Sequence, residues 1–389
     1  MTTSYQQQIA ELAEACALKL KFEDAGFRVR EIIPPATDLF DPMLGWVDDD
    51  SSLVFCDIGG QAKEPGWDPH EGHGSIWRLH RNDHLEAIVP RGAIGKGMIM
   101  FPMKSSASFG EYSSQLFFLG QLKPGRAGAH NTHAVYWVPP GWDTPEVFCT
   151  VPHTGSIGKG ISGALCPAGW GEDGSPEEGM FFVVSLLNCV LYKITPDRQI
   201  TPWLICDEDH VGHQFMPTTL FRASQDWGDD AGALIVAGRP NTSFERPAEL
   251  SGQLQTGFWR IDDPHTSPRL TRVPGPADPR VADLAIIRRV EGPYAPEGFG
   301  AFAGQRFACL PGSANLAHTT MLDSIPYDAS IVRYDADGEV HPFATQLQSG
   351  APALLFQGDR MIVSIVRKSY STGDYHLPDG SIYEITYVG

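Results

Sequence analysis

A short apolar phrase recurs six times along the chain, at a period somewhat above 50 residues. Each copy is a five-residue run such as Ser-Ile-Trp-Arg-Leu, preceded by another run rich in β-branched and aromatic residues. The copies occupy residues 75–79, 134–138, 190–194, 257–261, 330–334 and 381–385. Self-similarity at this period is typical of β-propellers, in which each repeat forms one four-stranded blade. The sequence therefore predicts an all-β fold, a six-bladed β-propeller.

The last repeat stops at Gly389, before any fourth strand. Residues 27–33 precede the first repeat and have the same strand-like character, so we expect them to complete the last blade. That closure favours six blades over five or seven. Residues 6–20 have the apolar spacing of a short amphipathic helix, which we expect to cap the propeller. The expected organisation is an N-terminal helical cap over residues 1–26 and one propeller over residues 27–389.

The composition excludes several classes of partner. A net charge of −18 argues against nucleic acid and acidic membranes. No stretch approaches the roughly 20 apolar residues of a membrane span, and the N-terminus has no basic start and no apolar signal core. The seven cysteines show no paired spacing, which favours buried, reduced thiols. We expect a cytoplasmic protein of small-molecule metabolism, either a monomer or a homodimer, with no nucleic-acid or membrane partner.

In a propeller the innermost strands begin around one axis, so residues far apart in sequence become neighbours there. A residue followed by Gly or Pro marks the expected start of each innermost strand. The six positions are Asp41, Lys96, Lys159, Met216, Glu297 and Ala351. We expect them to form a ring at the mouth of the central channel, where two acids and two ammonium groups would meet in a partly desolvated space. Such packing shifts pKa values and is typical of functional sites, although structural ion-pair networks have the same effect.

Histidines are concentrated in the loops expected at one face of the propeller, which hold nine of the thirteen. Three pairs have the spacing His-x-x-His, at residues 70 and 73, 130 and 133, and 210 and 213. A single pair of this kind is more often a solvated turn than a site. For the whole set we expect at least two histidines to share a site, because imidazole clusters bind metals or transfer protons. The strongest candidates are His153 and His213, since each precedes a ring position.

At Glu297, within the run Ala-Pro-Glu-Gly-Phe, and at Asp41, the chain resembles a superfamily of calcium-dependent six-bladed propellers. It comprises the senescence-marker-protein/gluconolactonase, paraoxonase and strictosidine-synthase-like proteins, whose lactonases hold an axial divalent ion. The resemblance implies Asp41 and Glu297 as ligands of such an ion. However, Lys96 and Lys159 stand where Asn or Asp ligands are expected, and each ammonium would repel a cation by roughly 4 kcal/mol at 4 Å. The expected metal ligands are therefore Asp41, Glu297 and His213.

Three functions are compatible with these patterns. The first is a lactonase-like or esterase-like hydrolase, in which Ca²⁺ or a histidine-bound transition metal polarises a carbonyl and a histidine activates water. The second is a lyase, isomerase or cyclase that uses axial Lys, Glu and His on a carboxylate-bearing substrate. The third is a ligand-binding propeller without catalysis. Long irregular loops favour an enzyme with a small-molecule substrate and no organic cofactor. The expected catalytic residues are Glu297, Lys96, Lys159, His153 and His213.

Overall fold

The structure is a computed structural model that describes the strand-bearing parts of the chain. The described residues are 7, 10, 11, 14, 20–22, 25–34, 39–40, 42–59, 74–95, 99–123, 132–141, 144–151, 165–171, 181–185, 190–206, 215–223, 229–240, 257–273, 294–310, 329–335, 340–347, 351–366 and 380–389. Within these ranges the chain forms 24 β-strands and two short 3₁₀ helices. None of the helices in these ranges has the length and apolar character that crossing a membrane requires.

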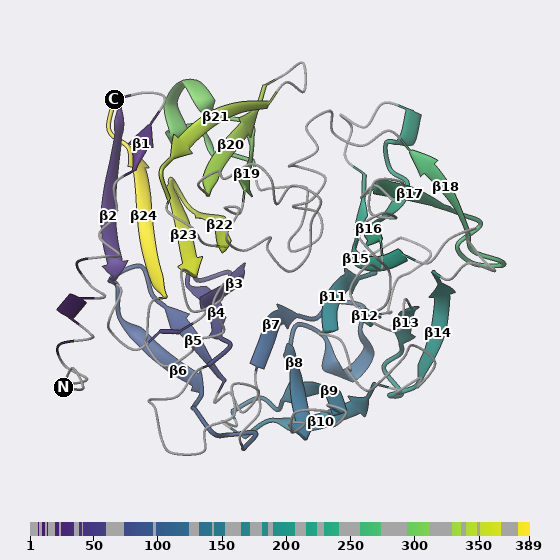
Figure 1. The fold of residues 1–389 in the computed structure, drawn as a ribbon. Helices are drawn as coiled ribbons and strands as arrows, with labels where there is room; N and C mark the ends of the chain where they lie inside the picture. Colours follow the sequence, from purple (N-terminus) through teal and green to yellow (C-terminus); the bar gives the residue numbers. More distant parts are fainter. Residues whose placement is uncertain are drawn as a thin grey trace. The chain divides into compact units, whose positions relative to one another are not determined.

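The strands pair into six antiparallel sheets of four strands each (Figure 1). The chain divides into two compact units, residues 1–102 together with 291–389, and residues 103–290. Strand β7 crosses the boundary between them, and the other strands of its sheet belong to the second unit. The repeated phrase of the sequence forms β5, β9, β13, β17 and β24, each of which is the third strand of its sheet as predicted. It also forms β20, which lies between β19 and β21.

The first unit holds three sheets. One consists of β3 (Pro42–Val47), β4 (Leu53–Asp57), β5 (Ser75–Leu79) and β6 (Leu85–Val89). The next consists of β22 (Ala351–Gln357), β23 (Arg360–Val366), β24 (Ser381–Tyr387) and β2 (Phe27–Ile33). The last consists of β19 (Arg306–Leu310), β20 (Ser330–Tyr334), β21 (Val340–Thr345) and β1 (Lys21–Phe22). Strand β22 contacts both β19 and β3, so the β22–β24 sheet lies between the other two.

The second unit also holds three sheets. The first consists of β7 (Ile99–Lys104), β8 (Leu116–Lys123), β9 (Thr132–Val138) and β10 (Glu146–Thr150), with the 3₁₀ helix η1 (Gly110–Tyr112) between β7 and β8. The second consists of β11 (Leu165–Trp170), β12 (Phe181–Ser185), β13 (Val190–Ile194) and β14 (Ile200–Ile205). The third consists of β15 (Phe215–Arg222), β16 (Leu234–Pro240), β17 (Gly257–Asp262) and β18 (Arg269–Val273).

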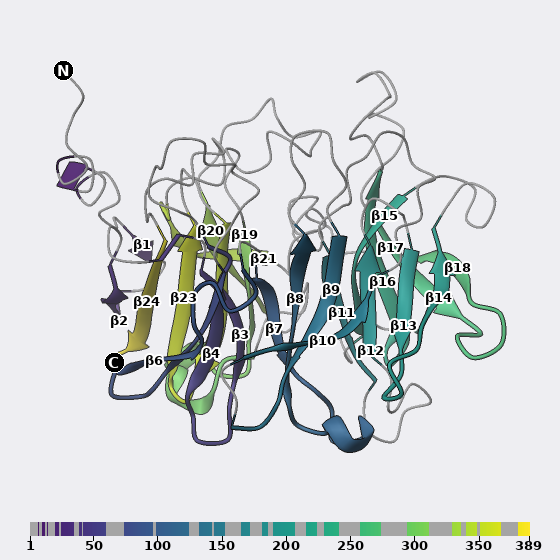
Figure 2. The ribbon, with the colours of Figure 1, turned by 90° about the horizontal axis from the view of Figure 1, so that it is seen from below.

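The N-terminal strand β2 pairs with β24, with Arg30 opposite Glu384, so the predicted completion of the last sheet is confirmed. Figure 2 shows β2, β24 and β23 side by side. A second pairing was not predicted: β1 pairs with β21, inside the region expected to be a helical cap. One N-terminal segment thus supplies the outer strands of two neighbouring sheets. Of the expected helix only Gln7, Ala10, Glu11 and Glu14 are described, so the cap itself is not shown.

An aromatic cluster fills the core between the β19–β21 and β22–β24 sheets. Phe27, the first residue of β2, is buried in it, with its ring centre 4.8 Å from that of Phe343 and 5.1 Å from that of Phe299. Edge-to-face and tilted ring pairs at these distances add to the free energy of apolar burial. The N-terminal strand is therefore part of the hydrophobic core as well as of the sheet.

The fifth repeat differs from the prediction at its first strand. Glu297 does not begin a strand; it begins the 3₁₀ helix η4 (Glu297–Phe302), directly before β19. Gly300 inside it has φ +62° and ψ −133°, which β-strand geometry excludes, and a Cβ there would meet the Tyr387 ring at 2.4 Å. The Gly/Phe pattern instead makes a tight turn that buries Phe299 and Phe302. Five of the six sheets contain the predicted innermost strand. In the remaining sheet β1 does not take the place of that strand, because it pairs with β21 at the edge opposite β19.

Candidate functional site

Most of the predicted site residues lie outside the described part of the chain. These are Asp41, Lys96, Lys159, His153 and His213. The exception is Glu297, whose side chain is exposed on η4. The described residues include the chain neighbours of Asp41, which are Phe40 and Pro42, and Gly95, which precedes Lys96.

The two ends of the β3–β6 sheet differ in their connections. At one end, which we call the strand-start end, β3 begins, and Pro42 pairs with Asp57, which pairs in turn with Ser75. At the opposite end, the turn end, tight turns join β3 to β4 and β5 to β6. Strand β3 starts directly after Asp41, so a site built on Asp41 belongs to the strand-start end.

The strands of the neighbouring β22–β24 sheet run so that its strand-start end lies beside the strand-start end of the β3–β6 sheet. At the strand-start end the backbone N–H of Gly380 donates to the carbonyl of Leu39 over 2.9 Å. At the turn end the side-chain amide of Gln357 donates to the carbonyl of Ser51. The start of β22 therefore lies at the same end as the start of β3.

Glu297 lies at the turn end, which the sequence did not predict. A Cβ added to Gly298 would meet Cγ of Asp359 at 2.4 Å, so η4 packs against the turn between β22 and β23. The seven residues of β22 span roughly 20 Å between its two ends. Glu297 therefore lies at the opposite end of the β22–β24 sheet from the start of β22, which corrects its predicted place at the start of an innermost strand. Asp41 and His213, the other two expected metal ligands, lie outside the described residues.

The strand-start end carries a buried acid that is paired with an arginine. Asp57, the last residue of β4, has no solvent exposure, and its Oδ2 lies 2.9 Å from Nη2 of Arg91, just after β6. Its Oδ1 accepts a hydrogen bond from the backbone N–H of Phe40 over 3.1 Å. The Arg91 guanidinium carbon lies 5.3 Å from the centre of the Phe40 ring. Thirty per cent of the Arg91 side chain remains exposed.

These contacts fix the chain on both sides of Asp41. Phe40 is held through its N–H by Asp57 and through its ring by Arg91, and only 4% of it is exposed. Pro42 begins β3, and a Cβ on Gly380 would meet its Cδ at 2.4 Å. A buried charge that is hydrogen-bonded and paired in this way orders the groups around it. The Asp57–Arg91 pair thus holds Phe40, the residue before Asp41, in place at the strand-start end.

A close glycine contact holds the start of β7 against the same end of the β3–β6 sheet. A Cβ on Gly74 would come within 2.3 Å of the backbone nitrogen of Ile99, the first residue of β7. Any other residue at Gly74 would push the two segments apart. Lys96 precedes Ile99 by three residues in the chain, and three residues span at most about 11 Å. The start of β7, the first described strand after Lys96 in the chain, therefore lies at the strand-start end.

In the second unit, His133 is a strand residue, whereas the sequence analysis placed it in a loop. It is the second residue of β9 and is 6% exposed. Its carbonyl accepts a hydrogen bond from the N–H of Val151 over 3.0 Å. Burial lowers the pKa of the imidazole to about 4, so the ring is neutral at pH 7.

The described cysteines agree with the expectation of reduced thiols. The side chains of four cysteines are described, and none of these four is in a disulfide: Cys56, Cys149, Cys206 and Cys309. Burial raises the pKa of Cys149 to about 12, against the opposing effect of the Arg198 charge. A thiol with such a pKa stays protonated at pH 7 and does not act as a nucleophile.

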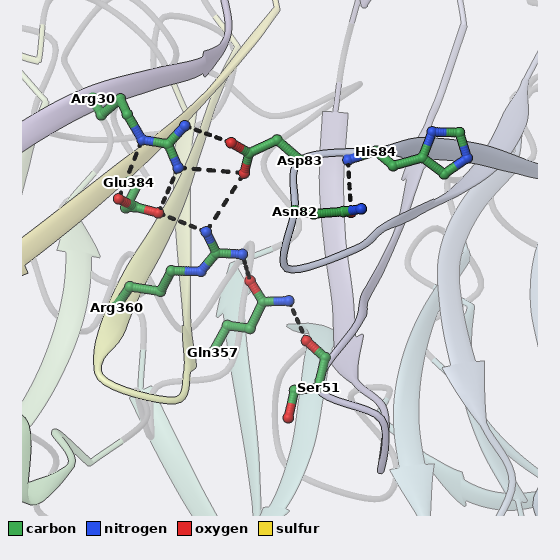
Figure 3. A network of polar contacts seen from close by, with 8 residues as sticks. All are labelled: Arg30, Ser51, Asn82, Asp83, His84, Gln357, Arg360 and Glu384. Carbon is green, nitrogen blue, oxygen red and sulfur yellow. Dashed lines mark hydrogen bonds and ion pairs between the residues drawn. The ribbon is translucent and has the colours of Figure 1, made fainter.

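The turn end carries a balanced network of two arginines and two acids (Figure 3). Arg30 contacts Asp83 at 2.5 Å and Glu384 at 2.9 Å, and Arg360 contacts Glu384 at 2.6 Å and Asp83 at 3.5 Å. The hydrogen bond to Asp83, followed by that to Glu384, raises the pKa of Arg30, and the bond from Arg30 lowers the pKa of Asp83. Burial acts to raise the pKa of Glu384, but the bonds from Arg30 and Arg360 outweigh it and lower that pKa. The network ties β2 to β23, β24 and the β5–β6 turn.

The donor groups described at the strand-start end do not by themselves form the calcium site that the resemblance implies. Among the described residues, no group of three or more His, Cys, Asp or Glu side chains could hold a metal ion. The acid that is present, Asp57, already engages Arg91 and the Phe40 N–H. A calcium ion requires several oxygen ligands and would here sit beside a guanidinium charge.

Sequence reasoning missed Asp57 and Arg91. One signal was available: Asp57 is a single acid that ends an otherwise apolar strand, Leu-Val-Phe-Cys-Asp. A charge in that position is buried by the sheet and requires a partner. The identity of the partner was not predictable, because Arg91 is 34 residues away in the chain.

No protein-family model matches the sequence. No curated protein matches it either. Among solved structures, the chain is similar to an α-L-arabinanase from Penicillium chrysogenum complexed with arabinobiose, at 10% identity over 92% of this chain and 98% of that one, with a TM-score of 0.50. Others include the gluconolactonase XC5397 from Xanthomonas campestris (10% identity, 94% of each chain, TM-score 0.47) and virginiamycin B lyase from Staphylococcus aureus with quinupristin (14%, 92% and 99%, 0.46). At such identities the likeness shows the fold alone, an all-β propeller.

Proposed function

We propose that the chain is a six-bladed propeller enzyme that acts on a small molecule at the strand-start end of its sheets. The observation that carries the proposal is the Asp57–Arg91 pair, a buried acid that holds a partly exposed guanidinium at that end. The chain neighbours of two predicted site residues, Asp41 and Lys96, are fixed beside it. The turn end, by contrast, carries a charge network in which each charge faces an opposite one.

The chemistry proposed is that of a lactonase-like or esterase-like hydrolase. Cationic side chains stabilise negative charge that develops on a carbonyl oxygen, and Lys96 and Lys159 are the candidates for this role. A histidine, His153 or His213, accepts a proton from the attacking water. The sequence pattern supports the assignment of Lys159, His153 and His213. The position of Glu297 at the turn end removes it from the proposed site.

A lyase or isomerase is the second candidate, and one observation favours it. The charge offered to solvent by the described strand-start end is a guanidinium, while the acid is buried behind it. This arrangement suits a substrate that carries a carboxylate, which the cations would hold while a lysine or histidine removes a proton. Such a reaction requires neither water as a reactant nor a bound metal.

The test is turnover of a panel of lactones, aryl esters and unsaturated carboxylates by the purified protein, with and without EDTA. We expect activity on at least one class, a loss of roughly 10²- to 10⁴-fold in Lys96→Met or Lys159→Met if that lysine stabilises or transfers charge, and no effect of EDTA. Full activity in both lysine variants would contradict the proposed site. Hydrolysis products distinguish the first candidate from the second.

A further inference from the structure

We propose that an aromatic cage in the second unit is a binding site for planar organic cations, and that Arg198 of this chain occupies it as a built-in ligand. The cage consists of the rings of Tyr112, Trp137 and Phe148, from η1, β9 and β10. Arg198 belongs to the turn between β13 and β14, so its insertion latches the β11–β14 sheet to the β7–β10 sheet. All four residues lie in the second unit, and the proposed enzymatic reaction uses none of them.

Three rings contact one guanidinium. Its carbon lies 5.1 Å from the centre of the Phe148 ring, 5.5 Å from that of Tyr112 and 5.9 Å from that of Trp137. The Tyr112 ring is nearly perpendicular to the other two, with centre-to-centre distances of 4.9 Å to Trp137 and 5.0 Å to Phe148. Tyr112 and Phe148 are buried, and Nε1 of Trp137 donates a hydrogen bond to the side-chain carbonyl of Gln115. A cation within about 6 Å of a ring centre is attracted by the ring quadrupole, so three fixed rings make a preorganised cation site.

The polar contacts of Arg198 show that the cage, and not an acid, holds its charge. Nη2 and Nε both donate to the hydroxyl of Tyr112, over 3.0 Å and 3.3 Å. Within the described part of the chain no carboxylate forms an ion pair with Arg198, although the sequence holds 47 acids. A guanidinium is planar and more weakly hydrated than an ammonium, so it stacks on rings more readily. We therefore expect the cage to prefer guanidinium cations.

The turn that carries Arg198 has the same backbone geometry as the turn that carries Asp83 in the first unit. In each turn the N–H of this residue donates to the carbonyl three residues before it over 2.9 Å, and its φ is +64°. Aspartate tolerates this left-handed conformation, whereas it is unfavourable for arginine. A Cβ on Gly110 would meet Cβ of Pro196 at 3.0 Å, so the turn also packs against η1. The contacts of the Arg198 side chain must therefore offset the backbone cost.

The first experiment empties the cage. Arg198→Asn places a residue that tolerates the left-handed backbone in the turn, so relief of strain alone would raise the melting temperature. We expect the melting temperature to fall instead, by roughly 2 to 4 °C, because the cage loses its cation. Arg272→Gln is the control, since Arg272 is an exposed arginine of the same unit, on β18. It removes the same charge and should change the melting temperature by about 1 °C or less.

The second experiment fills the empty cage again. Methylguanidinium chloride is titrated into the Arg198→Asn variant, and the melting temperature is recorded at each concentration. N-methylurea has nearly the same shape without the charge and is the first control, and sodium chloride at equal ionic strength is the second. We expect a saturable rise with methylguanidinium alone. The wild type, whose cage is occupied, should show no such rise.

Two cage variants locate the binding of methylguanidinium. Trp137→Leu combined with Arg198→Asn removes one ring, and the rise should disappear. Tyr112→Phe combined with Arg198→Asn keeps all three rings and removes the hydroxyl acceptor, so it should fold and should raise the midpoint concentration roughly threefold or more. Equal melting temperatures of the wild type and Arg198→Asn, or no rise with methylguanidinium, would overturn the inference. An equal rise with N-methylurea, in the wild type or without the Trp137 ring would overturn it as well.

Discussion

The two ends of the sheets in the first unit use charge in opposite ways. At the turn end, two arginines and two acids close on one another and on the N-terminal strand (Figure 3). At the strand-start end, one fully buried acid holds one partly exposed arginine. A balanced network of paired charges stabilises the fold, whereas at the strand-start end 30% of the Arg91 side chain remains exposed to solvent. The comparison indicates that changes at the turn end should alter stability and changes at the strand-start end should alter binding.

The largest effect is expected from removal of the N-terminal strand. Deletion of residues 1–33 exposes the edge of β24, removes Phe27 from the aromatic core and leaves Glu384 without Arg30. We expect the loss of the cooperative thermal transition, measured by calorimetry. Deletion of residues 1–20 keeps β1 and β2 and is the control. A cooperative transition in the longer deletion would show that the turn end does not depend on β2.

The next largest effect is expected in the second unit, from the buried side chain of His133. His133 has its pKa lowered from 6.5 to about 4 in the folded state, so the unfolded chain binds the proton more readily between these values. Stability should be complete above pH 6.5 and fall as the pH approaches 4, by roughly 3 kcal/mol, since each pH unit contributes about 1.4 kcal/mol.

Denaturant unfolding at pH 7 and pH 4.5 measures this effect. In His133→Gln the difference between the two pH values should shrink relative to the wild type, because the titrating group is gone. If both proteins lose the same stability on acidification, the imidazole is not protected by burial.

A smaller effect separates the two arginines of the turn end. The side chains of Arg360 and Glu384 are 11% and 13% exposed, while that of Arg30 is 46% exposed. Arg360→Met should lower the free energy of unfolding by about 2 to 3 kcal/mol, because it leaves a mostly buried carboxylate short of a partner. Arg30→Met should cost about 1 kcal/mol or less. Urea denaturation measures both, and equal losses would contradict the account of the network.

The sequence was sufficient to predict an all-β propeller, because the repeat indicates the strands. The phrase at residues 75–79 became β5, and the N-terminal strand β2 pairs with β24 as expected. Strand β1 was not predictable, since two residues carry no periodicity. The error at Glu297 has a physical cause: an acid followed by Gly looks the same at a strand start and in a 3₁₀ turn, and only the packing of Gly298 on Asp359 and of Gly300 on Tyr387 separates them.

For the proposed site, the sequence indicated only the end of the sheets and not the residues that are paired there. The strand-start end could be expected to carry function because inner strands begin there. The Asp57–Arg91 pair depends on a contact across 34 residues that no local pattern indicates. Asp57 differs from the surface acids because it is fully buried, and the sequence alone does not give the burial of a side chain.

The most direct test of the central claim compares the two ends in one assay. Turnover of the best substrate from the panel is measured for Arg91→Lys and for Glu297→Gln, with melting temperature recorded for each variant. We predict that Arg91→Lys raises KM roughly tenfold or more with little change in melting temperature, and that Glu297→Gln leaves kcat and KM unchanged. Loss of turnover in Glu297→Gln with full activity in Arg91→Lys would place the site at the turn end and contradict the account.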